Sequence, residues 1–308
     1  MKEKSLKNSS LKALDFFEEF CLYKKASGVS ERTLSDYKMI QKILNDCNLT
    51  EIKTHVIKYF ANLNVNPVTF NTRLKLLKTY CNWLVSEKIV EENPITIKKR
   101  KEDTKPRAVA LDDIKKILNC CNKDTWSGLR DYTLILLQID TGIRPSEARQ
   151  LKVKDVNLKT GIIELPSEIA KTRTSRVVPV SVPVISHISR LIKNRHEAWD
   201  DEDVPLFCTE TGCLLDRASW ARRLRKYSEM ADVKITPYSL RHSFATSFLR
   251  EGGSSLVLQE LMGHATQTMT KRYVALLNGD LITQHDRYTP INNLLKKETK
   301  NVIKKIKK

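Results

Sequence analysis

Residues Thr236–Tyr273 read TPYSLRHSFATSFLREGGSSLVLQELMGHATQTMTKRY, and this stretch organises the second half of the chain. His264 directly follows Gly263, and Tyr273 comes nine positions later. A spacing of nine does not place two residues on the same face of one helix, where partners are three or four apart. Gly263 is expected to end a helix, and Thr266 can cap a new one that carries Tyr273 about two turns in. His264 and Tyr273 are therefore expected to face one point from two different elements.

A second motif lies upstream, where Thr141–Leu151 reads TGIRPSEARQL. Gly142 and Pro145 are expected to interrupt a helix there and to present Arg144 at the end of an element. Arginine suits phosphate because its planar fork donates two parallel hydrogen bonds and stays charged. Glu147 is a supporting residue that can orient Arg144 or a neighbour. Taken alone, the motif is also typical of an ion pair that stabilises the start of a helix.

Four motifs in order resemble the tyrosine recombinase (phage integrase) family over about residues 10–290. They are TGIRPSEARQL with Arg144, SLRH with Arg241, MGH with His264, and KRY with Tyr273. The resemblance implies that Tyr273 is a nucleophile attacking a DNA phosphorus, that Arg144 and Arg241 clamp the phosphate, and that His264 is a third donor. The chain begins almost directly with a helical bundle, so it resembles the compact members that lack a separate arm-binding domain.

Two strands, over residues 161–165 and 176–180, are expected to flank the turn AKTRTS. The family places its catalytic lysine on this turn, and Lys171 is the matching position, with a general-acid role toward the leaving 5′ oxygen. Arg173 could be confused with Lys171 for this role, and we prefer Lys171. Arg173 and Arg176 are in addition candidate DNA contacts.

One position departs from the family, which usually has histidine three residues before the second arginine. Here the residue is Tyr238. A phenol can donate a hydrogen bond to phosphate, but it cannot be cationic near neutral pH. We therefore retain Tyr238 as a catalytic candidate for the hydrogen bond, while the acid–base help of that histidine is in doubt. His242 follows Arg241 and is expected to point elsewhere on the helix, in a structural role.

The expected fold class is mainly α with two domains. A four-helix, SAM-like bundle is expected in residues 1–97, and a mixed α+β domain with a small antiparallel sheet in residues 108–295. The resemblance implies that the bundle is a core-binding domain and that polar residues of its fourth helix contact DNA. These candidates are Asn71, Thr72, Arg73, Lys75 and Lys78. The same residues would also fit the solvated face of an amphipathic helix.

Residues 98–107 are expected to form a basic linker and residues 296–308 a Lys-rich tail. A short hairpin is expected over Leu206–Leu215 and a last helix over about Leu281–Leu295. The helix over Asp216–Ala231 is the most basic one of the second domain, and by resemblance it could enter the major groove. Its arginines could read guanine edges or bind phosphate. The candidates on this helix are Arg217, Arg222 and Arg223.

The chain has 308 residues and a net charge of +18, divided as about +7 in residues 1–100, +5 in 101–295 and +6 in 296–308. This spread fits a polyanionic partner, although Lys-rich solvated helices would give the same composition. Seven cysteines without a second ligand pair at finger spacing indicate reduced thiols rather than a zinc site or disulfides. No signal core, membrane-length apolar run or GxxxxGK loop occurs, so a cytoplasmic, nucleoid-associated protein that does not use ATP is expected.

The resulting hypothesis is a site-specific DNA recombinase, an integrase, excisionase or resolvase, that works through a 3′-phosphotyrosyl intermediate and needs no cofactor. The resemblance implies double-stranded DNA as substrate and a homotetramer on two paired sites, with exchange of the C-terminal helix between copies. The sequence does not decide whether an accessory DNA-bending or directionality protein takes part in the reaction. Two alternatives remain. One is a catalytically silent DNA-binding regulator of the same fold, which only Tyr238 supports. The other is a type IB topoisomerase, which would relax plasmids without a preferred site.

Overall fold

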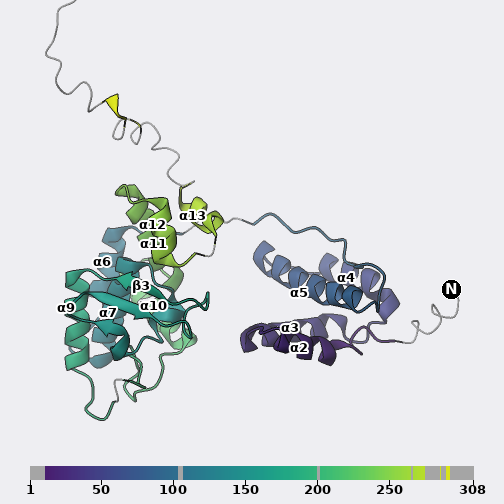
Figure 1. Ribbon diagram of the computed structural model, residues 1–308, viewed down its shortest axis with the longest axis horizontal. Coiled ribbons are helices and arrows are strands. Elements are labelled where there is room, and N and C mark those ends of the chain that lie inside the picture. The colour runs from purple at the N-terminus through teal and green to yellow at the C-terminus, as the bar shows by residue number, and fades with distance from the viewer. Residues whose placement is uncertain are drawn as a thin grey trace, which may run out of the picture. The chain divides into compact units, whose positions relative to one another are not determined.

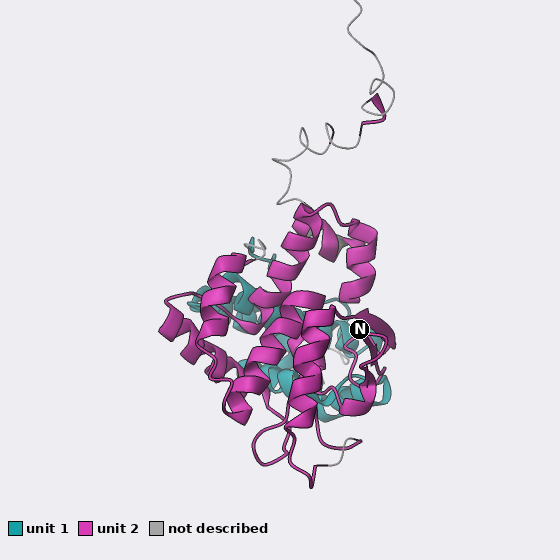
Figure 2. Cartoon of the chain, turned by 90° about the vertical axis from the view of Figure 1, so that its left-hand side faces the viewer, with its two compact units in different colours: residues 1–103 teal, residues 104–308 magenta. Residues whose placement is uncertain are grey.

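The chain divides into two compact units, Met1–Asp103 and Thr104–Lys308 (Figure 2). The computed structural model describes residues 11–102, 107–199, 202–264, 266–274, 285 and 289–291. Each unit has an apolar core of its own. The described elements are mostly helical and include a three-stranded antiparallel sheet, which confirms the predicted fold class. The division between the units falls inside the predicted linker.

The described residues of unit 1 form a bundle of four helices with a 3-10 turn before the third (Figure 1). They are α2 (Phe17–Ala26), α3 (Glu31–Leu44), η1 (Leu49–Glu51), α4 (Ile52–Ala61) and α5 (Pro67–Ser86). Ser30 caps α3 by accepting a hydrogen bond from the Thr33 amide, and Asn66 caps α5 by accepting one from the Thr69 amide. Such caps fix where a helix begins because they satisfy amides that have no partner inside it.

The residues that follow the bundle pack back onto α5. The Arg100 guanidinium lies 3.9 Å from the centre of the Phe70 ring. Asn71 Nδ2 donates to Arg100 O at 2.8 Å and to Glu102 Oε1 at 2.7 Å, and Asn71 Oδ1 accepts from Arg100 N at 2.8 Å. The first half of the predicted linker therefore belongs to unit 1. The buried Asn71 amide is used in these bonds, and its role as a DNA contact stays a prediction.

Unit 2 is built around α7, which contacts both α9 and α11. Its helices are α6 (Leu111–Asn119), α7 (Trp126–Thr141), α8 (Pro145–Ala148), α9 (Val182–Lys193), α10 (Arg217–Ala231), α11 (Pro237–Arg250), α12 (Ser255–Met262) and α13 (Gln267–Val274), with a 3-10 turn η2 (Val153–Asp155). In Figure 1, α11, α12 and α13 form one group at the end of the unit. This group carries the motifs of Thr236–Tyr273.

The sheet of unit 2 has the order β1-β2-β3 and consists of β1 (Val156–Asn157), β2 (Ile162–Leu165) and β3 (Arg176–Pro179). Ile163 pairs with Val178, and both side chains are buried. The short strand β1 was not predicted. The predicted hairpin at Leu206–Leu215 is wrong in its strands: among the described residues it keeps only a tight turn, in which Thr209 N donates to Cys213 O.

Two glycine turns shape the region where the motifs meet. Gly142 ends α7 with φ +64°, and a Cβ at this position would lie 2.2 Å from the Phe244 ring. Gly263 ends α12 with φ +61°, and a Cβ there would lie 3.0 Å from the Arg176 guanidinium carbon. Positive φ and close approach both favour glycine.

Some predictions lie outside the described residues. These are the tail over residues 296–308 and, apart from residues 285 and 289–291, the last helix over about Leu281–Leu295. Within the part of the chain that the structure describes, no helix combines the length and the apolar character needed to span a bilayer.

Candidate active site

Glu147 lies at the centre of a buried charged cluster. Its Oε1 accepts a hydrogen bond from Arg144 Nη1 at 2.9 Å, and its Oε2 accepts one from Arg176 Nη2 at 2.6 Å. Oε1 also accepts from the backbone amide of Lys171 at 3.2 Å. Burial by itself would raise the pKa of Glu147, but the hydrogen bond and charge of Arg176 and the charge of Arg144 outweigh it and lower that pKa. The ionised carboxylate therefore ties the first motif to the lysine turn and to the start of β3.

The two motif arginines are held by backbone carbonyls of the glycine turns. Arg144 Nη2 donates to Gly263 O at 2.5 Å, and Arg241 donates from Nη1 to Gly142 O at 2.5 Å and from Nη2 to Met262 O at 2.8 Å. Both side chains are buried. Arg144 thus binds the turn at Gly263, and Arg241 binds the turn at Gly142 as well as Met262 O. These bonds fasten together two segments that are far apart in sequence.

The cluster carries more positive than negative charge. Burial, followed by the charge of Arg144, lowers the pKa of Arg241 from 12.5 to about 10. Burial and the charges of Arg241, Arg144 and Arg176 lower the pKa of His264 to about 4, so this imidazole is neutral near pH 7. His264 Nδ1 lies 2.9 Å from Thr270 Oγ1, which orients the ring. Three guanidinium groups around one carboxylate favour an anionic ligand such as a phosphodiester.

Tyr273 reaches this cluster from α13, which packs against α11. Its ring is 5% exposed and lies with apolar side chains of α11 and α12, which are Phe244, Ala245, Leu249, Leu258 and Met262. Its hydroxyl, in contrast, lies 2.7 Å from His242 Nδ1 and acts electrostatically on Arg241. The ring is also parallel to that of His264, with 6.3 Å between their centres. The hydroxyl therefore faces polar groups although the ring is buried.

The prediction that His242 points away from the site is wrong. Adjacent residues of an α-helix point about 100° apart, so the sequence predicts that His242 lies on a different face of the helix from Arg241. Arg241 reaches the glycine turns, while His242 reaches α13 at Tyr273. The packing of α13 on α11 was not readable from either segment alone.

Lys171 and Tyr238 are placed near solvent. Lys171 is exposed on the turn between β2 and β3, and Arg173 on the same turn is exposed with φ +55°. Tyr238 lies in the first turn of α11 and is 47% exposed. Arg149 is a buried arginine that the sequence analysis did not select, and it donates to Leu215 O. The catalytic roles of Lys171 and Tyr238 stay proposals.

Arg176 was predicted as a DNA contact, and this stays a prediction. Its side chain is 11% exposed, and its Nη1 and Nη2 donate to Glu147. The partner lies 29 residues away, so no local spacing pattern predicts the pair. The sequence feature that could have indicated this role is the place of Arg176 at the start of a strand, directly after the turn that carries Lys171.

The bundle carries a basic groove between α3 and α5. Arg73 lies in it and donates from Nη1 to Tyr59 Oη at 2.6 Å. Four basic residues line the groove, with one acidic residue, Asp36, and neutral side chains such as Thr69 and Thr72. The basic residues are Arg32, Lys38, Lys42 and Arg73. Of the other candidates on α5, Lys75 is exposed and Lys78 is half-buried. The sequence reading missed the basic residues of α3 because it followed only one helix.

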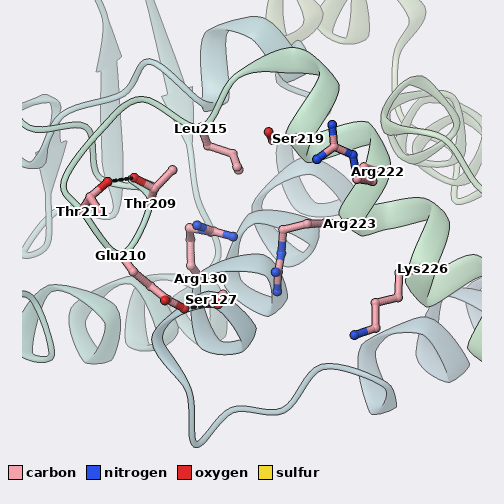
Figure 3. A pocket seen from close by; sticks show the side chains of 10 residues that line it. All are labelled: Ser127, Arg130, Thr209, Glu210, Thr211, Leu215, Ser219, Arg222, Arg223 and Lys226. Carbon is pink, nitrogen blue, oxygen red and sulfur yellow. Dashed lines mark hydrogen bonds between the residues drawn. The ribbon is translucent and has the colours of Figure 1, made fainter.

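A second basic pocket of about 500 Å³ lies beside α10 (Figure 3). Arg217 and Arg222 are exposed on this helix, as a DNA contact requires. Arg223 instead donates to the buried Asp131 carboxylate and to Tyr227 Oη. These bonds tie α10 to α7, and the assignment of Arg223 as a DNA contact stays a prediction.

The guanidinium groups of Arg144 and Arg241, with a neutral imidazole, can hold a phosphodiester, and the Tyr273 phenol can attack it. On this mixed helical fold, they define a tyrosine-type DNA strand transferase. The chain belongs to the Phage integrase family, whose sequence profile matches residues 107–279.

Known relatives agree with this membership. Tyrosine recombinase XerA of Pyrococcus furiosus is 27% identical over 304 residues, which cover 96% of this chain and 99% of the relative. The solved structure of the Tn1549 transposon integrase with transposon right end DNA gives a TM-score of 0.74 at 19% identity, over 90% of this chain and 99% of that one. A lambda integrase tetramer bound to a Holliday junction gives a TM-score of 0.69 at 16% identity, over 88% and 80%. At these identities the two structural matches establish the fold.

Proposed function

We propose that this chain is a site-specific DNA recombinase that cuts and rejoins strands through a 3′-phosphotyrosyl link to Tyr273. The observation that supports the proposal is that Arg144 and Arg241 bind carbonyls of the two glycine turns, while the Tyr273 hydroxyl lies 2.7 Å from His242, the residue next to Arg241. The similarity of the chain to tyrosine recombinase XerA of Pyrococcus furiosus supports it.

In the proposed reaction the Tyr273 oxygen attacks a backbone phosphorus, and the bond from phosphorus to the 5′ oxygen breaks. Negative charge grows on the non-bridging oxygens, where Arg144 and Arg241 donate hydrogen bonds and His264 is a third donor. Lys171, on its exposed turn, protonates the leaving 5′ oxygen as a general acid. The tyrosyl link retains the energy of the phosphodiester, so a 5′ hydroxyl can reverse the step without ATP.

We assign DNA binding to both units. Residues 1–97 would form the core-binding domain, residues 108–295 the catalytic domain, and 98–107 a linker between them. The groove between α3 and α5 offers four basic side chains to phosphates, and exposed arginines of α10 offer further contacts. Contacts of this kind predict affinity that falls steeply with salt.

We further propose that four copies act on two paired sites and exchange a C-terminal helix over about Leu281–Leu295. The lambda integrase tetramer on a Holliday junction supports assembly of this kind. Deleting residues 281–295 is expected to abolish recombination and to spare binding of a single half-site. Efficient recombination by the deletion variant would refute the docking role.

The test of the function is covalent capture of DNA. Nicked duplexes with a randomised centre are incubated with the full chain, and complexes that resist denaturation by detergent are isolated and sequenced. We expect one preferred sequence, and we expect Tyr273→Phe to give no adduct. Absence of an adduct in the wild type would leave a DNA-binding regulator. Plasmid relaxation without sequence preference would favour a type IB topoisomerase.

A further inference from the structure

We infer that His242 is the general base that takes the phenolic proton of Tyr273 when this residue attacks DNA. The inference rests on the proposed function, since it assigns one more catalytic residue to that reaction. Its basis is the 2.7 Å distance between His242 Nδ1 and the Tyr273 hydroxyl. A general base must lie within hydrogen-bond reach of the proton that it removes, and this pair meets that condition.

The surroundings of His242 keep its imidazole able to accept a proton. Burial and the neighbouring charge of Arg241 lower the pKa of His242, so the ring is neutral at pH 7. A neutral imidazole has one nitrogen with a lone pair, whereas a phenol is a donor near pH 7. The Tyr273 O–H therefore donates to Nδ1, and the ring proton lies on Nε2.

Other groups of the cluster are less suited to this role. The Glu147 carboxylate is taken up by two guanidinium groups and a backbone amide. His264 Nδ1 is bonded to Thr270, and its ring lies parallel to that of Tyr273. Tyr238 is a phenol exposed to solvent and is not basic. His242 thus supplies the proton acceptor in a chain where tyrosine stands at the usual histidine position.

The proton balance of the step closes. As the bond from the Tyr273 oxygen to phosphorus forms, the phenolic proton passes to His242 Nδ1. As the bond from phosphorus to the 5′ oxygen breaks, that oxygen takes a proton from Lys171. In rejoining, the incoming 5′ hydroxyl returns its proton to the lysine, and the released tyrosine oxygen recovers its proton from His242. No oxidant, reductant or further reactant is required.

The experiment compares His242→Asn and His242→Ala in the full chain. Asparagine places an amide oxygen near the position of Nδ1, so it can accept a hydrogen bond but cannot take the proton. The substrate is the duplex recovered with the wild type, nicked so that cleavage cannot reverse. We expect both variants to form adduct about 100-fold or more slowly. His196→Ala, on an exposed loop, is the matched histidine control and should cleave as the wild type does.

A second substrate distinguishes loss of the general base from loss of the general acid. In a 5′-bridging phosphorothiolate duplex the leaving atom is sulfur, which departs without a proton. We expect this substrate to restore Lys171→Ala and to leave both His242 variants slow. Gel-shift binding of the uncleaved half-site and thermal unfolding report whether the variants are folded.

Each outcome decides the inference. A His242→Asn variant that cleaves at close to the wild-type rate overturns the base role, because the hydrogen bond alone would then suffice. Restoration of the His242 variants by the phosphorothiolate also overturns it, because His242 would then act on the leaving group. If the wild type forms adduct and Tyr273→Phe does not, the proposed function stands in either case. If the wild type forms no adduct, both are refuted.

Discussion

Replacing Glu147 by glutamine tests whether one carboxylate organises the whole cluster. Glu147 Oε1 accepts from Arg144 Nη1, Arg176 Nη1 and Lys171 N, while Oε2 accepts from Arg176 Nη2 and Arg144 N. Glutamine keeps one of the two carboxylate oxygens and has an NH₂ group in place of the other. This NH₂ group faces N–H donors and cannot accept hydrogen bonds from them. Even the better orientation loses the two bonds to Oε2, and the buried guanidinium groups lose their counter-charge.

The expected cost follows from these losses. Breaking a buried ion pair by removing one charge costs about 3–5 kcal/mol. A unit of this size loses roughly 2–4 °C of melting temperature for each kcal/mol, so Glu147→Gln should lower the transition of unit 2 by about 6–20 °C. Calorimetry on the full chain measures this shift. Glu210→Gln is the matched control, because Glu210 is exposed and accepts one bond, from Ser127 Oγ, and should change stability by less than about 0.5 kcal/mol.

The pH dependence gives a second check. The pKa of Glu147 is lower in the folded chain than its ordinary value, so the carboxylate stabilises the fold above the unfolded pKa of about 4.3. That contribution is lost as pH falls through the folded pKa. The gap between Glu147→Gln and the wild type should therefore be full at pH 7 and should narrow below about pH 4. A melting temperature within about 2 °C of the wild type at pH 7 would refute the central role of Glu147.

Four further substitutions, at three positions, test other parts of the site. Arg241→Ala should leave DNA affinity in gel shifts largely intact while adduct formation falls on the order of 100-fold, because one donor to the transition state is lost; equal loss of both would count against the clamp. Tyr238→Phe should slow cleavage modestly and Tyr238→His should be tolerated, and an unchanged Phe variant would reduce Tyr238 to packing. Gly142→Ala should destabilise unit 2 by roughly 2–5 kcal/mol in thermal unfolding, since positive φ and the Phe244 ring both oppose a Cβ; a neutral effect would contradict this close approach.

Much of the helical framework was predictable because local chemistry specifies where helices begin and end. Ser30 caps α3, Pro67 begins α5, and Gly142 and Gly263 end helices with positive φ, as the sequence indicates. Strand β1, only two residues long, carries too few residues for an alternation pattern. It exists because β2 pairs with it.

The candidate DNA contacts show what reading along the chain leaves undecided. Asn71, Arg176 and Arg223 were chosen as polar or basic residues in suitable segments, yet each binds a partner inside its own unit. Residue type and helical face cannot tell a solvated cation from one that pairs with a distant carboxylate. The distinction depends on whether a carboxylate such as Asp131 is buried opposite.

The sequence by itself determined the kind of chemistry in this protein. Four motifs in order, with Arg144, Arg241, His264 and Tyr273, resemble the tyrosine recombinase family, and this resemblance implies phosphate binding and a tyrosine nucleophile. Only the tertiary structure decided that Glu147 joins Arg144 to Arg176 and that His242 meets the Tyr273 hydroxyl. The physical reason is that caps and turns depend on neighbours a few residues apart. The direction in which a buried polar group points depends instead on which distant segment packs against it.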